Sequence, residues 1–315
     1  MMSIPPEVES LAQERVVARA NKDYQQSDVL RDQLKELGFL IKDTADGYEL
    51  SEAPPFDQYQ NVQQLRQAHA RSVVATTTMI LVIDGWPEDV RTCLSAITAY
   101  MPADAAVIAI DCGNVESVGI MLEEMAQRDN RVHVFHVAQT LAESGWAGAV
   151  QCGIDLADST FIGVMDVSTI WEGDALTPML TVFDNPTVAL TGWRGVNVNV
   201  EDEWRTFTDA PAGSVDAVLG YFMLMRMSVA SDIGPNSKAR FYRNADMEWS
   251  LAIRSAGHDA VISAIELPLR QDRHHGYHDS DPEYRDQQSK KTYDRLLKTY
   301  RGKTNILHSK DSDGN

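Results

Sequence analysis

A repeated alternation of apolar and helical stretches constrains the fold of this chain more than any other feature. Short apolar runs rich in β-branched residues lie at residues 79–83, 107–110, 132–137 and 161–165. Each run has the length of a buried strand, and the stretches between them are long enough for helices that cross back over a sheet. The pattern predicts βαβ units and therefore an α/β fold with a doubly wound sheet.

The intervening stretches carry helix signals of their own. Pro87 stands where a helix would begin, with Glu88 and Asp89 in its first turn. Further helices are expected over residues 117–127 and 147–156. Beyond Trp193 the regular spacing is lost, and we expect the polar segment 194–213 to be a mobile loop.

The N-terminal part has a different organisation. Residues 7–50 predict a helical hairpin with a small β tail, in which Ser27 caps the second helix (28–37) and Gly38 ends it. Asp46-Gly47 between two short apolar runs predicts a β-hairpin. The expected domains are a helical unit at 1–51, a linker with a short polar helix at 52–77, the α/β domain at 78–306 and a disordered tail at 307–315.

Composition excludes several classes of function. The 315 residues carry a formal net charge of -18, which disfavours binding to RNA and to anionic membranes. The three cysteines include no CxxC pair, which argues for a reducing compartment without disulfides or a zinc cluster. The sequence contains neither a signal-peptide core nor an apolar run long enough to span a membrane, so we expect a cytoplasmic protein without a transmembrane helix.

Acidic residues follow three of the four predicted strands. They are Asp84 with Gly85, Asp111 with Gly113, and Asp166. An aspartate at a strand end is commonly only a turn former or a helix cap. The carboxyl ends of parallel strands, however, meet at the edge of a sheet where ligands bind, so three acids in this order indicate a site.

These residues resemble the motifs of family 2 glycosyltransferases with the GT-A fold, over about 220 residues. The first strand and its loop, Ile83 to Trp86, match the family's nucleotide-holding loop, and Asp111 with Gly113 matches its base-binding motif. A glycine-containing stretch that includes Gly148 precedes the next helix. The family's pair of aspartates separated by one residue is matched by Asp166-Val167-Ser168, with Ser168 in place of the second aspartate.

The later half of the chain continues the resemblance. Gly220 to Arg226 resembles the family's glycine-led strand, and residues 242–257 resemble its acidic helix, with Asp246 at the position of the catalytic base. Ala245 replaces the preceding glutamate of that motif and Glu248 replaces the following aspartate. The stretch His274-His275-Gly276 resembles the closing histidine motif.

The resemblance implies an inverting transfer of a sugar, of hexosyl type, from a nucleoside-diphosphate sugar to an unknown acceptor, on a mixed sheet of GT-A type. Asp246 would be the base that deprotonates the acceptor. Asp166 would hold the diphosphate through Mg²⁺ or Mn²⁺, and His274, His275 or His278 would complete the metal shell. Arg254 or Arg273 would neutralise phosphate or orient a carboxylate. The nucleotide would lie against residues of the strand-end loops, namely Ile83, Asp84, Gly85, Asp111, Gly113, Gly148 and Asp166.

Three alternatives remain open from the sequence. Because two family acids are replaced, by Ser168 and Ala245, the domain is either an active transferase or a non-catalytic nucleotide-binding or scaffold protein on a degenerate GT-A fold. Asp246 and Glu248 also suit the solvated first turn of a helix. The third alternative is an RNA-associated protein, led by its N-terminus.

The N-terminal forty residues resemble the C-terminal end of cysteinyl-tRNA synthetases. This resemblance implies the same small fold, used either as an RNA-contacting module or as a packing and docking module, and the excess of acids favours the second. The matching positions are Arg19, Lys22-Asp23, Ser27-Asp28, Leu30-Arg31-Asp32, Leu34, Gly38, Asp43-Thr44 and Asp46-Gly47.

Overall fold

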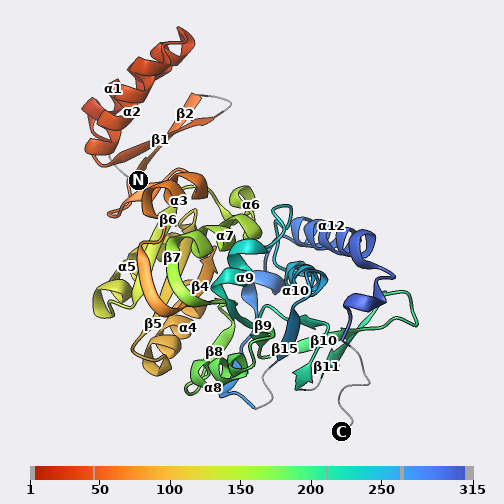
Figure 1. Ribbon diagram of the computed structural model, residues 1–315. Helices are drawn as coiled ribbons and strands as arrows, with labels where there is room; N and C mark the ends of the chain where they lie inside the picture. The colour runs from red at the N-terminus through yellow and green to blue at the C-terminus, as the bar shows by residue number, and fades with distance from the viewer. Residues whose placement is uncertain (1–3, 45–46, 211, 263–265, 309–315) are drawn as a thin grey trace. The chain divides into compact units, whose positions relative to one another are not determined.

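The computed structural model describes residues 4–44, 47–210, 212–262 and 266–308, which belong to two compact units, Met1–Asp57 and Gln58–Asn315 (Figure 1). The predicted disordered tail lies mostly outside the described residues, as does Asp46 of the predicted turn. Among the described residues, no helix is both long enough and apolar enough to cross a membrane.

The first unit is a helical hairpin followed by a β-hairpin. Val8, Ala12 and Leu34 are buried between its elements. The second helix begins earlier than expected, because the side chain of Asp23, not Ser27, caps it by accepting a hydrogen bond from the amide of Gln26 at 3.0 Å. Its elements are α1 (Pro6–Ala20), α2 (Tyr24–Glu36), β1 (Phe39–Thr44) and β2 (Gly47–Glu52).

A mixed sheet forms the centre of the second unit. In the described residues it has nine strands, in the order β12-β15-β9-β14-β7-β4-β5-β6-β3. The strands from β7 to β3 are parallel, whereas β14 is antiparallel to both β7 and β9. The predicted α/β class with a mixed, doubly wound sheet is therefore confirmed. The strands are β3 (Gln58–Tyr59), β4 (Val73–Ile83), β5 (Ala105–Cys112), β6 (Val132–Val137), β7 (Ala157–Met165), β9 (Val188–Gly192), β12 (Gly213–Ser214), β14 (Phe222–Arg226) and β15 (Asp259–Ile262).

Alternation along the strands creates a core on each face of the sheet. Ile80 and Ile108 pack in one cluster with Val150 of α7, whereas Met79 and Leu81 pack in another cluster with the residues of α4 and α5. Figure 1 shows α10 and α12 together at the end of the unit away from α4 and α5. The helices are α3 (Val62–His69), α4 (Pro87–Tyr100), α5 (Val118–Arg128), α6 (Leu141–Ser144), α7 (Trp146–Leu156), α8 (Leu176–Thr181), α9 (Met227–Asp232), α10 (Ala245–Ser255), α11 (His275–His278) and α12 (Pro282–Tyr300).

Residues 58–77, which we expected to be a linker, are instead built into the sheet unit. Tyr59 of β3 pairs with Val137, and Val73 at the start of β4 pairs with Ala157. Leu65 of α3 is fully buried in the core. Tyr59, Val62 and Leu65, scattered among glutamines and asparagine, pack against this core, so the stretch gives little periodic signal.

The segment 194–213 also differs from the expected mobile loop. It forms the hairpin of β10 (Gly195–Val198) and β11 (Phe207–Ala210), and Trp204 between them is only 1% exposed. Strand β10 also pairs with β13 (Ala217–Val218). The half-exposed polar residues of this small sheet hide the alternation on which strand prediction depends.

Candidate active site

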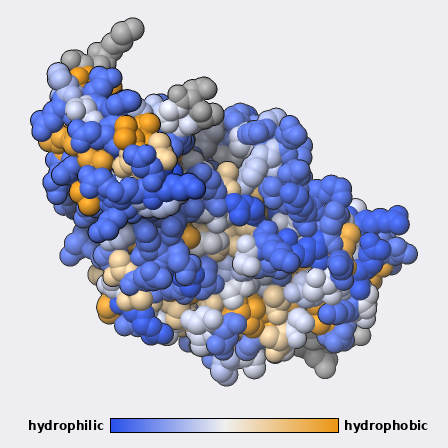
Figure 2. All heavy atoms as spheres, turned by 90° about the horizontal axis from the view of Figure 1, so that it is seen from above, coloured by the Kyte–Doolittle hydropathy of each residue, from blue (hydrophilic) through white to orange (hydrophobic). Residues whose placement is uncertain are grey.

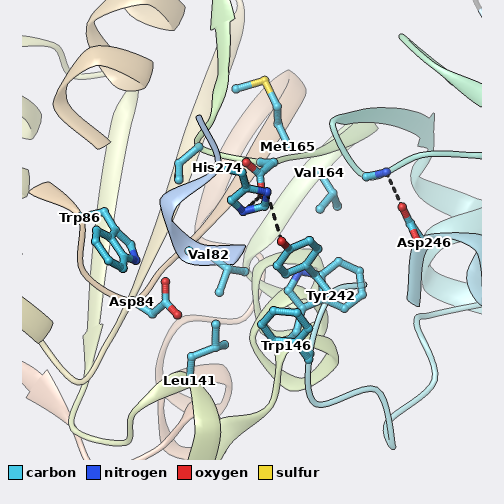
Figure 3. A pocket seen from close by; sticks show the side chains of 15 residues that line it. Val82, Asp84, Trp86, Leu141, Trp146, Val164, Met165, Tyr242, Asp246 and His274 are labelled. Carbon is cyan, nitrogen blue, oxygen red and sulfur yellow. Dashed lines mark hydrogen bonds and ion pairs between the residues drawn. The ribbon is translucent and has the colours of Figure 1, made fainter. Parts of the chain in front are cut away.

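The candidate site lies at the carboxyl ends of β4 and β7, the two neighbouring strands from which the chain continues in different directions. From β4 the chain passes through α4 to β5 on one side, and β7 lies against the other side of β4. Ligands of open α/β sheets bind beyond the carboxyl ends of strands at such a switch point. A cavity occurs there (Figure 3). It is lined by residues at the ends of β4 and β7 and just beyond them, by Gly220, and by residues of the stretches 241–246 and 274–276.

Asp166 follows β7 and is held from two sides. The amide and hydroxyl of Ser168 both donate to its Oδ1, at 2.8 and 2.5 Å, and Nε2 of His274 lies 2.9 Å from its Oδ2. Burial alone would raise the pKa of Asp166, but the contacts with His274 and Ser168 outweigh it and keep the pKa below its ordinary value. Asp166 is therefore a carboxylate at neutral pH, and Ser168 orients it.

Tyr242 completes a chain of polar contacts to Asp166. Its hydroxyl lies 3.1 Å from Nδ1 of His274, and the two rings stack with centroids 4.8 Å apart. Burial raises the pKa of the Tyr242 hydroxyl, so it stays protonated and can donate to Nδ1. A proton on Nε2 of His274 then satisfies the contact with Asp166. In Figure 3 the Tyr242 ring stands between His274 and Trp146.

Asp246 lies on the opposite side of Tyr242 from Asp84 and Trp86 (Figure 3). It occupies the first turn of α10, where its carboxylate accepts from the amides of Gly220 at 2.7 Å and Met247 at 2.8 Å. Burial raises the pKa of Asp246 to about 6, although the two amides act against this rise. Asp246 is thus a part-buried group in the cavity that titrates near neutral pH, not a solvated acid of a helix turn.

Asp84 is a second acid with a raised pKa. It follows β4 and lines the cavity beside Trp86. Burial, and then the charge of Asp166, raise its pKa to about 6. The glycine after it, Gly85, has a φ of 112°, which allows the tight turn at the end of the strand.

The residues present fit a divalent metal only in part. In the part of the chain that the structure describes, no group of three or more side chains of His, Cys, Asp or Glu is arranged to hold an ion. Asp166 Oδ2 and His274 Nε2 alone are 2.9 Å apart, which is close to the separation of about 3 Å between neighbouring ligands with bonds of about 2.1 Å. These two side chains suit one edge of a metal shell that substrate and water would complete, provided that Nε2 gives up its proton and Nδ1 takes one up to donate to the hydroxyl of Tyr242.

His275, which we expected among the metal ligands, lies elsewhere. Its Nδ1 is 2.6 Å from Oδ2 of Asp89 in α4, and its ring stacks on Trp86 with centroids 5.6 Å apart. The pairing fixes the loop that carries His274 against the start of α4. His275 therefore does not join Asp166 and His274.

Asp111 does not line the cavity. It is fully buried, and its Oδ2 lies 2.7 Å from Nδ1 of His136, whose Nε2 lies 3.1 Å from Glu123. The other oxygen of Asp111, Oδ1, is buried without a hydrogen-bond partner among the described residues, so a base-binding role would require the surrounding residues to expose it. No signal in the sequence marks His136 or Glu123 as its partners.

The other residues predicted for the nucleotide have backbone or packing roles. Ile83 is buried in the core, Gly113 has a φ of 82° and packs against Thr140, and Gly148 lies in α7 outside the lining of the cavity. Gly85 and Gly113 thus shape turns at the ends of β4 and β5.

The cationic residues considered for phosphate are also engaged elsewhere. Arg254 donates to the carbonyls of Ile306 and Val215, and Arg273 pairs with Asp279 at 2.7 Å. The lining residues that we did not predict include Tyr242, Trp146 and Gly220. Tyr242 lies within the quoted acidic-helix motif, but neither its contact with His274 nor the position of Trp146 is visible in sequence spacing.

Comparison with solved structures shows the fold. The crystal structure of GalNAc-T7 with UDP, GalNAc and Mn²⁺ matches with a TM-score of 0.56 and 14% identity, over 71% of this chain and 48% of that one. The mannosyltransferase PcManGT from Pyrobaculum calidifontis, in complex with GDP-Man and Mn²⁺, matches with a TM-score of 0.53 and 12% identity, over 92% and 76%. The chain therefore has the GT-A fold that its motifs predict.

The N-terminal resemblance is also confirmed. Residues 2–49 match the cysteinyl-tRNA ligase anticodon binding domain. The cysteine–tRNA ligase of Bacteroides fragilis is 55% identical over 42 residues, which are 13% of this chain and 9% of the ligase. That of Leptospira interrogans is 54% identical over 41 residues, again 13% and 9%. The match thus spans about a tenth of the length of these relatives.

Residues 82–243, just over half of the chain, match the model of glycosyl transferase family 2. The match includes the ends of β4 and β7 and extends to Tyr242, so it covers most of the cavity described above. This protein belongs to glycosyl transferase family 2.

Proposed function

We propose that this chain transfers a hexosyl group from a nucleoside-diphosphate sugar to an acceptor hydroxyl, with inversion at the sugar. The observation that carries the proposal is the opposite behaviour of two carboxyls in one cavity. The pKa of Asp166 is lowered, whereas that of Asp246 is raised to about 6. Environments that separate two such groups assign them different roles in one reaction.

Asp166 and His274 would hold the diphosphate end of the donor. Asp166 stays ionised, and Ser168 orients its carboxylate toward His274. Asp166 and His274 together would offer one oxygen and one nitrogen beyond the carboxyl end of β7. A bound Mg²⁺ or Mn²⁺ would neutralise the charge that develops on the leaving diphosphate. The names of the similar structures, with UDP or GDP-Man and Mn²⁺, support this choice of donor and metal.

Asp246 would be the general base. A base that titrates near neutral pH combines a large deprotonated fraction with a strong enough affinity for the proton of the acceptor. The amides of Gly220 and Met247 donate to its two oxygens, so the carboxylate is held in one orientation before it accepts the proton of the acceptor hydroxyl. Its place across Tyr242 from Asp84 and Trp86 would put the acceptor and the nucleotide on different sides of the sugar.

The donor site is tested by thermal unfolding with UDP, GDP, CDP and TDP, each with Mn²⁺, Mg²⁺ or EDTA. Binding to the native state raises the midpoint, so one nucleotide should do so in a metal-dependent way. Asp166→Asn should abolish the metal-dependent part, while Asp232→Asn, at an exposed position of α9, should not. Absence of a shift with every nucleotide would instead favour a non-catalytic scaffold.

We also place the protein in the cytoplasm. Cys93, Cys112 and Cys152 are free thiols, and three unpaired cysteines suit a reducing compartment.

A further inference from the structure

A second cavity adjoins the first on the side of Asp246. Its volume is about 370 Å³, and it shares Asp166, Tyr242, Asp246 and His274 with the first cavity. From this shared floor it extends outward between aromatic and polar side chains. These are Tyr221, Tyr277, Arg243, Asn244, Gln271 and His278.

Arg243 lines this cavity without a carboxylate partner. Its guanidinium lies over the ring of Tyr277, 4.9 Å from the centroid, and its side chain is exposed. Within the described ranges no carboxylate oxygen lies within 4 Å of it. Its charge acts on Asp246 and Asp286 without a direct contact.

Arg194 lies beside the same cavity, and its guanidinium likewise stacks on aromatic rings. Its guanidinium lies 4.2 Å from the ring centroid of Trp193 and 5.3 Å from that of Tyr221. It donates to the amide oxygen of Gln271 at 3.4 Å and, in the described part of the chain, has no carboxylate within 4 Å. Tyr221 and Gln271 both line the cavity, so Arg194 stands at its rim.

Within the segments that the structure describes, the absence of a carboxylate partner sets Arg194 and Arg243 apart from other arginines near the cavity. The chain has 46 acidic residues against 28 basic ones, and neighbouring arginines pair with carboxylates. Arg270 pairs with Asp272, Arg273 with Asp279 and Arg285 with Asp286. A guanidinium held on an aromatic face keeps its N–H groups at the edge, where they can bind a carboxylate or phosphate in bidentate fashion.

The cavity is therefore polarised. Asp166 and Asp246 make its floor acidic, so an anion would be repelled there, whereas Arg194 and Arg243 make its rim basic, with the exposed His278 nearby. The rings of Tyr221 and Tyr277 line the cavity between floor and rim, and they hold the guanidinium groups of Arg194 and Arg243 in place. A molecule that is neutral at one end and anionic at the other matches this arrangement.

We propose that the acceptor is an anionic saccharide, whose free hydroxyl faces Asp246 while its carboxylate or phosphate binds Arg194 and Arg243. This inference rests on the proposed transferase function. The donor diphosphate, which we place at Asp166 and His274, would lie on the floor that both cavities share, so the variants below distinguish an acceptor anion at the rim from a donor phosphate.

The test measures binding of small probes to the full chain by saturation-transfer NMR titration. Methyl β-glucuronide supplies the carboxylate, glucose 6-phosphate the phosphate, and methyl β-glucoside is the neutral match. We expect at least one anionic probe to bind about tenfold or more tightly than the glucoside, and to weaken as salt rises. The preferred probe identifies whether the anion is carboxylate or phosphate.

Variants separate this subsite from the donor site. Arg194→Gln with Arg243→Gln should reduce the anionic probe to the affinity of the glucoside and leave the nucleotide-induced thermal shift unchanged. Arg91→Gln, an exposed arginine of α4, is the matched control and should change neither. Equal binding of all probes, binding of none, or full affinity in the double variant would overturn the anionic acceptor. Absence of a nucleotide-induced shift in the wild type, together with selective binding of an anionic probe, would overturn the transferase function and leave only an anion-binding site at the two arginines.

Discussion

At the scale of single residues, the site depends on how each acid is surrounded. The sequence located Asp84, Asp166 and Asp246, because strand ends and motif order mark their positions, and the structure places all three at one cavity. The pKa of each depends on partners distant in sequence, such as His274 beside Asp166. Spacing carries no information on such contacts, which is why neither the contact of Tyr242 with His274 nor that of His275 with Asp89 was predicted.

Asp84→Asn should stabilise the protein at pH 8. The pKa of Asp84 is raised in the folded state to about 6, so its favourable contribution is complete at pH values below its unfolded pKa and is lost as the pH rises through 6. A neutral asparagine avoids that loss, which amounts to about 3 kcal/mol at pH 8 for a pKa raised from 3.8 to about 6. Thermal midpoints should therefore differ at pH 8 and converge at pH 4. A lower midpoint for the variant at pH 8 would show that Asp84 is stabilising as a carboxylate.

At the scale of elements, α10 joins the site to the end of the sheet unit. Glu248, two residues after Asp246, is 3% exposed and forms a bidentate ion pair with Arg295 of α12, with both contacts at 2.6 Å. Asn236 donates a further bond to it at 3.0 Å. Glu248 therefore fixes the helix that carries Asp246 and does not face the cavity.

Glu248→Ala should lower the free energy of unfolding by about 3 kcal/mol or more, because it leaves the charge of Arg295 largely buried without a partner. Asp294→Ala breaks an exposed pair with Lys290 on the same helix and should cost less than about 1 kcal/mol. Denaturant unfolding of the two variants gives the comparison. Equal small effects would mean that the buried pair does not hold α10 to α12.

Elements with continuous apolar runs were predictable from sequence, and marginal elements were not. The strands β4 to β7 were found because each is buried on both faces. The two residues of β3 and the hairpin of β10 and β11 escaped, because their stability comes from pairing with strands distant in sequence or from one buried side chain such as Trp204.

At the scale of the molecule, acidity limits the partners. The face shown in Figure 2 is largely hydrophilic, with small separate hydrophobic patches. In residues 1–57, the part that resembles an anticodon binding domain, twelve acidic residues stand against six basic ones. This N-terminal unit thus resembles an anticodon binding domain but has no excess of positive charge.

We accordingly expect no measurable binding of tRNA at physiological salt, since a surface of net negative charge repels the phosphate backbone. Fluorescence anisotropy with labelled tRNA, and with a polyanion such as heparin as a control for charge, tests this. Saturable binding of tRNA that weakens with salt would show a local basic surface and restore the RNA-associated alternative.

The most direct test of the transferase account is the release of nucleoside diphosphate by wild type and Asp246→Asn between pH 5 and 8, with the donor that the nucleotide screen identifies. Because the base must be deprotonated and its pKa is about 6, the wild-type rate should rise as the pH passes 6 and then level. The variant should lose about a hundredfold or more while it keeps the nucleotide-induced thermal shift. A variant that retains most of the activity, or a wild-type rate that falls as the pH rises through 6, would contradict the assignment of Asp246 as the base.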